Sequence, residues 1–336
     1  MPRLISIIVP AYNERDNVQE LARRLGLVFA ERLPGYAFEA IIVENGSADD
    51  TWEKLEGVHL DDPRFKAVQL ARNFRMDGGI TAGLQYATGD AAVIMTADLQ
   101  DPPEVIPEFV AKWEEGYENV YGIVTERQGT GPIRRLNSEM FYWLAGKLTG
   151  EAFPRNASDF RLVDRRVYEA VRDMDERNRF MRGLFAWVGF RSIGVPHTRP
   201  PRFGGVSHAH TFKVLDLAMK GIFAHSYVLL KLISLVGVTL SALSAVALVM
   251  LTVRFILFGV PFAGFGTIVC LVILLFGFLF TMLGVMSEYV GLIYEEVKQR
   301  PNFVVRQTLG IGAPATGRDP LGTGAAVSRG EPQRSS

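Results

Sequence analysis

Short apolar runs alternate with amphipathic stretches over the first part of the chain. The runs at residues 5–9 (ISIIV), 38–44 (FEAIIVE), 65–70 (FKAVQL) and 91–95 (AAVIM) have the length and β-branched content of buried strands. Between them, stretches such as NVQELARRLGLVFA and GGITAGLQYA show helical spacing of apolar residues. Strands separated by crossover helices predict an α/β domain with a parallel sheet and helices on both faces.

Two long uncharged stretches lie later in the chain, from Leu232 to Val253 and from Val260 to Met286. Each reaches the length of about 20 residues that a helix needs to cross the ~30 Å hydrocarbon core of a bilayer. The sequence LVILLFGFLFTMLG has no polar stripe at helical spacing, which the alternative, a buried helix pair in a soluble bundle, normally shows. We therefore predict two transmembrane helices within residues 231–287.

The charges around this hairpin predict its orientation. The connector FGVPFAGFG is uncharged, whereas basic residues stand outside the hairpin: Lys213, Lys220 and Lys231 before it, and Lys298, Arg300 and Arg306 after it. Because positive residues favour the cytoplasmic side, both chain ends are predicted to be cytoplasmic. The first apolar run is interrupted by Pro10 and is too short for a signal peptide, so the soluble region is expected to stay on the cytoplasmic side. Together with the two predicted spans, this predicts a multi-pass protein of the inner (plasma) membrane.

The rest of the chain divides by composition. Residues 1–211 carry charges of both signs and form the predicted soluble domain. Residues 212–230 place apolar residues at helical spacing with lysines between them, which indicates a helix in the membrane interface; a linker helix packed on the soluble domain is the alternative. Residues 288–309 are the predicted cytoplasmic juxtamembrane segment, and residues 310–336, rich in Gly, Ala, Pro and Ser, a disordered tail.

Net charge and cysteine content limit the possible partners. The 36 Lys and Arg residues balance the 36 Asp and Glu residues, so composition gives no indication of a nucleic-acid partner. The single cysteine, Cys270, forms no intramolecular disulfide, which favours a reducing compartment. The sequence leaves open whether the protein is a homo-oligomer.

Polar side chains follow each predicted strand of the first domain at the point where the strand ends. They are Tyr12, Asn13 and Glu14, then Glu44 and Asn45, then Arg72 and Asn73, and finally Asp98, Gln100 and Asp101. In parallel sheets, ligands bind outside these carboxyl ends. Turns and helix caps are the structural alternative for several of these residues. Capping does not explain acids at successive strand ends, because they repel unless a cation or donor-rich ligand lies between them. The edge is therefore predicted to be a cation-assisted phosphate site.

Several longer blocks complete the pattern: IIVPAYNE, IIVENGSADDT, LARNF, TADLQDPPE, SDFRLVDRRV, ERNRFMRGLFAWVGF, RFGGVS and SEYVGLIYEEVKQRP. With these blocks, from residue 4 to about 305, the chain resembles family 2 glycosyltransferases, of the branch that loads sugars onto polyprenyl phosphates (bactoprenol or dolichyl-phosphate glycosyltransferases). The resemblance implies a GT-A-like (Rossmann-like) α/β domain with a mostly parallel sheet.

The resemblance also implies an activity. An inverting transferase would take a sugar from a nucleoside-diphosphate sugar, with UDP favoured over GDP, and move it to a polyprenyl phosphate with the help of Mg²⁺ or Mn²⁺. The lipid-linked monosaccharide would serve cell-envelope glycosylation. The same fold acting on another lipid or a polysaccharide, and a catalytically impaired membrane scaffold, are the alternatives.

Site residues follow from the resemblance position by position. It implies catalytic roles for Asp159, Asp98 and Arg202, and metal contacts for Asp98 and Gln100. It implies donor binding by Pro10, Tyr12, Glu14, Glu44, Asp98, Gln100 and Arg127, and acceptor phosphate binding by Arg202, Ser207 and Arg134. Asp159 would be the base or would orient the acceptor, and the alternative is a surface carboxylate paired with Arg161 or Arg165.

Three positions depart from the family pattern. Glu44, Thr96 and Val124 stand where the family usually has Asp, Asp and Arg. The longer Glu44 side chain shifts the carboxylate relative to the base, and Arg127 or Arg134 with its neighbour could replace the missing arginine charge. Loss of the acid at 96 is compatible with metal binding, because Mg²⁺ takes only one or two protein carboxylates together with water and substrate phosphates.

Overall fold

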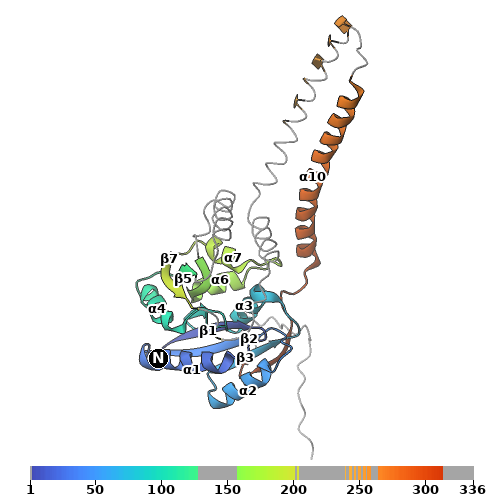
Figure 1. Cartoon of the computed structure of the whole chain (residues 1–336). Helices are drawn as coiled ribbons and strands as arrows, with labels where there is room; N and C mark the ends of the chain where they lie inside the picture. The colour runs from blue at the N-terminus through green and yellow to red at the C-terminus, as the bar shows by residue number, and fades with distance from the viewer. Residues whose placement is uncertain are drawn as a thin grey trace, which may run out of the picture. The chain divides into compact units, whose positions relative to one another are not determined.

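The computed structural model describes residues 2–127, 157–200, 203 and 264–312, together with scattered single positions between 239 and 258 (Figure 1). The chain falls into two compact units, which are described separately. The first comprises Met1–Ser138, Ala152–His208 and Pro301–Ser336, and the second Glu139–Glu151 and Ala209–Arg300.

The first unit is built on one sheet with the strand order β7-β5-β6-β4-β1-β2-β3-β8. Its centre is parallel, as predicted: β4 (Ala91–Ile94), β1 (Arg3–Ala11), β2 (Tyr36–Glu44) and β3 (Phe65–Leu70). The outer strands are β5 (Asn119–Arg127), β6 (Ala157–Asp164), β7 (Ser192–Arg199) and β8 (Val305–Leu309). Strand β6 runs antiparallel to β4 and β5, so the sheet is mixed beyond its parallel core.

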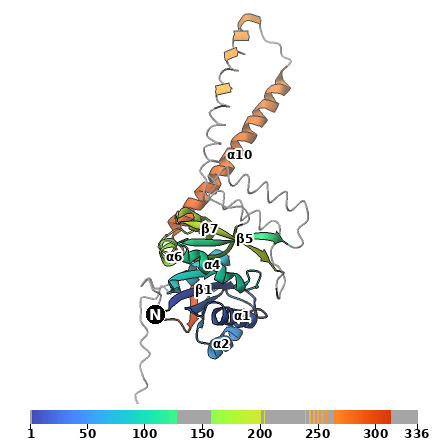
Figure 2. The ribbon, with the colours of Figure 1, turned by 90° about the vertical axis from the view of Figure 1, so that its left-hand side faces the viewer.

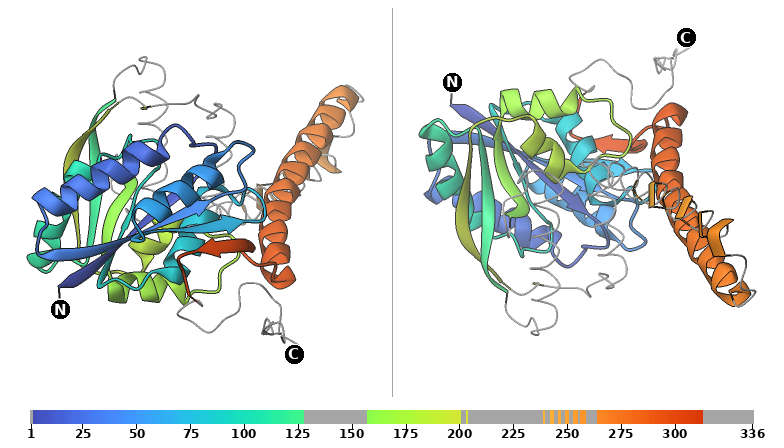
Figure 3. Two further views of the ribbon diagram at one scale, coloured as in Figure 1. Left: turned by 90° about the horizontal axis from the view of Figure 1, so that it is seen from below. Right: turned by 90° about the horizontal axis from the view of Figure 1, so that it is seen from above.

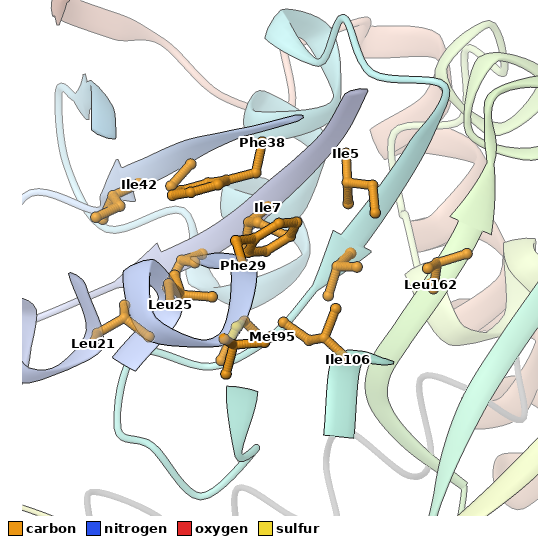
Figure 4. Packing of buried hydrophobic residues seen from close by; sticks show 14 of the residues in the cluster. Ile5, Ile7, Leu21, Leu25, Phe29, Phe38, Ile42, Met95, Ile106 and Leu162 are labelled. Atoms are coloured by element: carbon orange, nitrogen blue, oxygen red, sulfur yellow. The ribbon is translucent and has the colours of Figure 1, made fainter. Parts of the chain in front are cut away.

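Helices cover both faces of this sheet (Figure 3). One core packs between the sheet and α1 (Val18–Glu31), α2 (Thr51–Asp61) and α4 (Ile106–Glu114), which follows the short 3₁₀ turn η1 (Pro103–Val105). The other packs against α3 (Arg75–Tyr86), α6 (Arg165–Arg172) and α7 (Met181–Trp187). Neighbouring residues of β1 divide between the two cores: Ile7 belongs to the first, seen in Figure 4, and Ile8 to the second.

Helix α3 approaches the sheet closely because its sequence is rich in glycine. A Cβ at Gly79 would lie 2.9 Å from Pro10 Cβ, closer than real side chains come. The absence of that carbon brings the start of α3 against the carboxyl end of β1. Pro10 is thereby placed on the α3 face of the sheet, with Ile8.

Strand β8 differs from the sequence prediction, which assigned residues 288–309 to a juxtamembrane segment. Val305–Leu309 pairs antiparallel with β3 at the edge of the sheet, and Phe303 and Val305 are buried. Ala71 N–H also donates to Val304 C=O over 2.9 Å. A five-residue strand with exposed polar positions carries too short a pattern to be recognised in sequence.

The described part of the second unit is dominated by α10 (Phe265–Lys298), a helix of 34 residues (Figure 2). Apolar side chains such as Ile268, Phe276 and Phe280 are exposed along it. Among the described residues one helix, Leu275–Lys298, is long and apolar enough to cross a membrane. The predicted second span ended at Met286, whereas the helix continues to Lys298. The predicted first span, the interfacial helix and nearly all of the tail lie outside the described residues.

Candidate active site

The carboxyl ends of the four central strands meet at one edge, and each is followed by a residue with left-handed backbone. These residues are Asn13 (φ 56°), Gly46 (φ 68°), Arg75 (φ 64°) and Leu99 (φ 59°). Three of them are not glycine, and bulky side chains rarely adopt this conformation. Backbone strain of this kind clusters where a protein fixes a ligand site.

Hydrogen bonds from asparagine and serine side chains connect the first three of these loops. Asn13 N–H donates to Ser47 Oγ over 2.9 Å, which joins the loops after β1 and β2. Asn45 Nδ2 donates to Arg75 C=O over 2.7 Å, and Asn45 Oδ1 accepts from Phe74 N–H over 2.8 Å. These two bonds join the loops after β2 and β3.

Glu14 accepts hydrogen bonds in the turn that leads into α1. It is 8% exposed, its carbonyl accepts from Asn17 N–H over 2.9 Å, and its side chain accepts from Asn17 Nδ2. Its own N–H donates to Thr51 Oγ1 over 3.0 Å. Glu14 therefore takes part in the turn before α1, while Tyr12 is 38% exposed.

Glu44 ends β2 with a buried carboxylate that is only half satisfied. The residue is 1% exposed, and Ser47 N–H donates to its Oε1. Among the described residues Oε2 has no hydrogen-bond partner. Glu44 lines a pocket of about 290 Å³ together with Ser47 and Trp52. Because an unpartnered buried acceptor is costly, this oxygen is suited to a ligand that offers a donor.

Thr96 lies between the two carboxylates of the loop after β4. Its Oγ1 is 2.7 Å from Asp98 Oδ1 and 2.8 Å from Asp101 Oδ2, and its N–H donates to Asp101 Oδ2 over 3.1 Å. Gln100 N–H donates to Asp98 Oδ1 over 3.2 Å. The Thr96 hydroxyl can donate its single proton to only one of the two carboxylates. The other short oxygen–oxygen contact therefore requires that Asp98 or Asp101 be protonated.

Asp101 is the acid suited to hold that proton. It is 1% exposed, and burial raises its pKa above the ordinary value, although Arg199 and Thr96 oppose the rise. Arg199 Nη2 lies 3.6 Å from Asp101 Oδ1. Thr96, which also contacts Asp101, thus supports the carboxylate of Asp98. Asp98 itself is 5% exposed.

The oxygens of this loop fit a hard divalent cation that also binds substrate. Among the described residues no group of three or more His, Cys, Asp or Glu side chains is arranged as a metal site. The loop contains the Asp98 carboxylate and the neutral side-chain oxygens of Gln100 and Thr96. A Mg²⁺-type ion needs only one or two protein carboxylates when phosphates and waters complete its shell.

Asp159 on β6 is held by an arginine that the sequence did not indicate. Arg182 Nε donates to Oδ1 over 3.0 Å and Arg182 Nη2 to Oδ2 over 2.6 Å. Burial alone would raise the pKa of Asp159, but the charge and hydrogen bonds of Arg182, together with the charges of Arg161 and Arg199, lower the pKa on balance. The alternative partner Arg161 instead lies with its guanidinium over the Phe185 ring, 4.8 Å from the centroid.

Asp77, in the first turn of α3, belongs to the same cluster. Its Oδ1 accepts from Met181 N–H over 3.0 Å, where α7 begins. The pKa of Asp77 is raised to about 6, mainly by burial and also by the charge of Asp159, while Met181 N–H and Arg182 oppose the rise. The block ERNRFMRGLFAWVGF marked this region in the sequence, but no single residue in it carried a signal for a role.

Several predicted site residues lie outside the described residues: Arg134, Arg202 and Ser207. Only the backbone of Arg127 is described, where it is in register with Arg199 on β7. Val124, at the position where the family usually has Arg, is buried in β5.

Comparisons with known proteins identify the chain's relatives. Residues 6–172 match the Glycosyl transferase family 2 model. Over 307 residues the chain is 40% identical to an uncharacterized glycosyltransferase of Synechocystis sp., covering 91% of this chain and 96% of that protein. The chain belongs to glycosyltransferase family 2. The family predicted from the sequence blocks is thereby confirmed, and the protein is a glycosyltransferase.

Two further matches of this family 2 glycosyltransferase extend the comparison. It is 32% identical over 304 residues to a bactoprenol glucosyl transferase of Shigella phage SfII, covering 90% of this chain and 98% of that protein. The solved structure of glucosyl-3-phosphoglycerate synthase from Mycobacterium tuberculosis, with Mn²⁺, UDP and phosphoglyceric acid, matches with TM-score 0.50 at 18% identity. That match covers 66% of this chain and 76% of that one, and confirms the predicted GT-A-like fold.

Proposed function

We propose that this glycosyltransferase moves a sugar, with inversion, from a nucleoside-diphosphate sugar to a polyprenyl phosphate at a membrane. The observation that carries the proposal is the pair of buried carboxylates, Glu44 and Asp98, at the ends of β2 and β4. Strand β1 lies between these strands, so their ends are about 10 Å apart, twice the interstrand spacing. A nucleoside diphosphate is long enough to contact both acids, with its base at Glu44 and its diphosphate at Asp98.

The leaving group determines what the loop after β4 must do. Asp98 and Gln100 are the proposed ligands of a Mg²⁺ or Mn²⁺ ion, with Thr96 holding Asp98 in place. The chemistry that such an ion supplies is neutralisation of charge on the departing diphosphate. The Mycobacterium tuberculosis enzyme of the same fold was crystallised with Mn²⁺ and UDP, and we propose a UDP-sugar as the donor here.

The acceptor needs orientation more than deprotonation. A phosphate monoester has a second pKa of about 6, so its oxygen is already anionic near neutral pH. Asp159 is therefore proposed to orient the acceptor. The Arg182 guanidinium offsets the negative charge that Asp159 would otherwise present to the phosphate. Arg202, Ser207 and Arg134 are the proposed phosphate ligands of the lipid, and Arg127 a further donor contact.

Membrane association fits both the relatives and α10. The proteins named bactoprenol glucosyl transferase act, by their name, on a lipid carrier, and α10 exposes apolar side chains over a length sufficient to cross a bilayer. We propose a multi-pass arrangement, with residues 1–211 and both chain ends on the cytoplasmic side.

A donor and acceptor screen tests the proposed function. The full chain, purified in detergent, is given radiolabelled UDP- or GDP-sugars and Mg²⁺, with polyprenyl phosphate, diacylglycerol or no acceptor in separate arms. We expect label in the chloroform-soluble fraction only with polyprenyl phosphate. Transfer to diacylglycerol alone, or no transfer from any common donor by folded protein, would contradict the proposal.

A further inference from the structure

Glu44, Gln69 and Gln307 form one row across three neighbouring strands. Glu44 of β2 is in register with Gln69 of β3, and Gln69 is in register with Gln307 of β8. Residues paired in this way place their side chains on the same face, about 5 Å apart. Gln307 Nε2 also donates to Gln69 Oε1 over 2.9 Å, so the row is joined by a hydrogen bond across its outer pair.

The row lines the pocket that contains Glu44. Trp52 of α2 lines the same pocket from the helix layer, and Arg306 lines it from β8. Trp52 Nε1 donates to Glu56 Oε1 over 2.7 Å, which fixes the indole ring. An aromatic ring near amide and carboxylate side chains suits a flat heterocycle, which stacks on the ring and presents its edge to the polar groups.

The charges of the pocket indicate which end of a nucleotide it takes. Three carboxylates, those of Glu44, Asp49 and Glu53, face one cation, Arg306. Phosphate oxygens are repelled by such a site, whereas ribose hydroxyls and base N–H groups donate to carboxylates. The pocket therefore fits the nucleoside part of a donor and leaves the phosphates to the loop after β4.

The hydrogen bonds within the row limit which base fits. Oε1 of Glu44 already accepts from Ser47 N–H, whereas Oε2 has no partner among the described residues, so Oε2 is the acceptor best suited to a ligand. Oε1 of Gln69 accepts from Gln307, so the Gln69 amide faces a ligand as a donor. Uracil presents one N–H between two carbonyl oxygens, whereas guanine presents two adjacent donor groups beside one carbonyl. An unpartnered carboxylate oxygen beside amide donors complements the uracil edge.

We infer that β8 is a functional wall of the nucleoside pocket, in which Gln307 orients Gln69 and the two amides, with Glu44, select a uridine over a guanosine nucleotide. This inference rests on the proposed function, since it assigns the base end of the same donor. It also gives a role to a segment that lies beyond α10 in the sequence and far from the other donor-site residues.

Nucleotide binding to the full chain in detergent tests the inference. Isothermal titration with UDP and with GDP, each with Mg²⁺, is carried out on the parent, on Gln307→Ala and on Gln69→Leu. Thr308→Ala is the matched control, because Thr308 is the next residue of β8, is exposed, and points to the other face of the strand. Melting temperatures confirm that each variant is folded.

We expect the parent to bind UDP more tightly than GDP and Gln307→Ala to lose about tenfold in UDP affinity, as for loss of a polar contact. The preference over GDP should shrink in both glutamine variants and persist in Thr308→Ala. If the parent forms the lipid product and both glutamine variants bind UDP as the parent does, the inference is wrong and the proposed function stands. A folded parent that binds neither nucleotide and transfers no sugar overturns both.

Discussion

Arg182 grips Asp159 through two parallel hydrogen bonds, from Nε to Oδ1 and from Nη2 to Oδ2. The arginine is the second residue of α7, and the first, Met181, donates its N–H to Asp77. Asp77 therefore fixes the point where α7 begins, and that point sets where Arg182 meets Asp159. Asp77 and the start of α7, which are distant in sequence, thus act together to orient one carboxylate.

Removing the guanidinium should change the pH dependence of transfer. In Arg182→Ala, the charge and hydrogen bonds that most strongly oppose the effect of burial are lost, so the pKa of Asp159 rises. Because the ionised carboxylate is the active form, the acid limb of the pH–rate profile should move to higher pH, and kcat should fall about 10- to 100-fold. Arg182→Lys should shift the acid limb only part of the way to higher pH, since lysine keeps the positive charge but not the bidentate geometry.

Arg166→Ala is the control for this variant, because Arg166 makes an exposed ion pair with Glu118 on the surface. Its kcat and pH profile should match those of the parent. If the acid limb of the pH–rate profile lies at the same pH in Arg182→Ala as in the parent, Arg182 does not set the ionisation of Asp159.

Asp77 predicts a pH-dependent stability difference. Its pKa is about 6 in the fold and 3.8 in the unfolded reference, so the folded chain holds a proton that the unfolded chain releases. Stability should therefore fall as pH rises from about 4 to 6 and then level off. Asp77→Asn keeps an acceptor for Met181 N–H and lacks this loss, so its advantage in unfolding free energy should grow to about 1–3 kcal/mol by pH 7.

Thermal unfolding of parent and variant across pH 4 to 8 measures that difference. The gap in melting temperature should be small near pH 4, where both forms carry a neutral side chain, and largest above pH 6. A gap that stays constant across the range would mean that Asp77 titrates in the fold as it does in the unfolded chain.

A carboxylate in place of Thr96 should tighten metal binding. Thr96→Asp puts a third acid beside Asp98 and Asp101, and its charge repels that of Asp98 until a cation is bound. We expect lower stability in EDTA, a larger rise in melting temperature with Mg²⁺, and a lower Mg²⁺ concentration for half-maximal activity. Thr96→Val, which only removes the hydroxyl, should lose about 1–3 kcal/mol of stability without gaining metal affinity.

Metal titrations of transfer activity and of melting temperature compare the two Thr96 variants with the parent. If Thr96→Asp has the parent's dependence on Mg²⁺ in both measurements, residue 96 lies outside the coordination sphere of the ion.

The parallel core and the strand-end acids could be predicted because they depend on local pattern. The runs ISIIV and FEAIIVE are long and apolar, and polar residues directly after them must reach the same sheet edge. The Asp159 contact could not be predicted in the same way. Arg161 and Arg165 are its neighbours in sequence, but the residue that pairs with its carboxylate is Arg182, which the start of α7 brings to it.

Strand β8 shows the same limit at the edge of the sheet. Its five residues follow a long apolar helix, and their pairing depends on the exposed edge of β3, more than two hundred residues earlier. Pairing over such a distance leaves no periodic signal in the segment itself. Residues on β8 therefore join Glu44 in one pocket without any sequence motif that connects them.

Formation of a lipid-linked sugar by Asp98→Asn compared with the parent tests the central claim most directly. The exchange keeps the side chain's size and removes the charge at the proposed metal and diphosphate position, and Asp16→Asn, at an exposed ion pair with Arg15, is the control. With radiolabelled UDP-sugar, polyprenyl phosphate and Mg²⁺, parent and control should give equal chloroform-soluble product, and Asp98→Asn should give about 100-fold less. Equal product from Asp98→Asn, or none from the folded parent, would contradict the account.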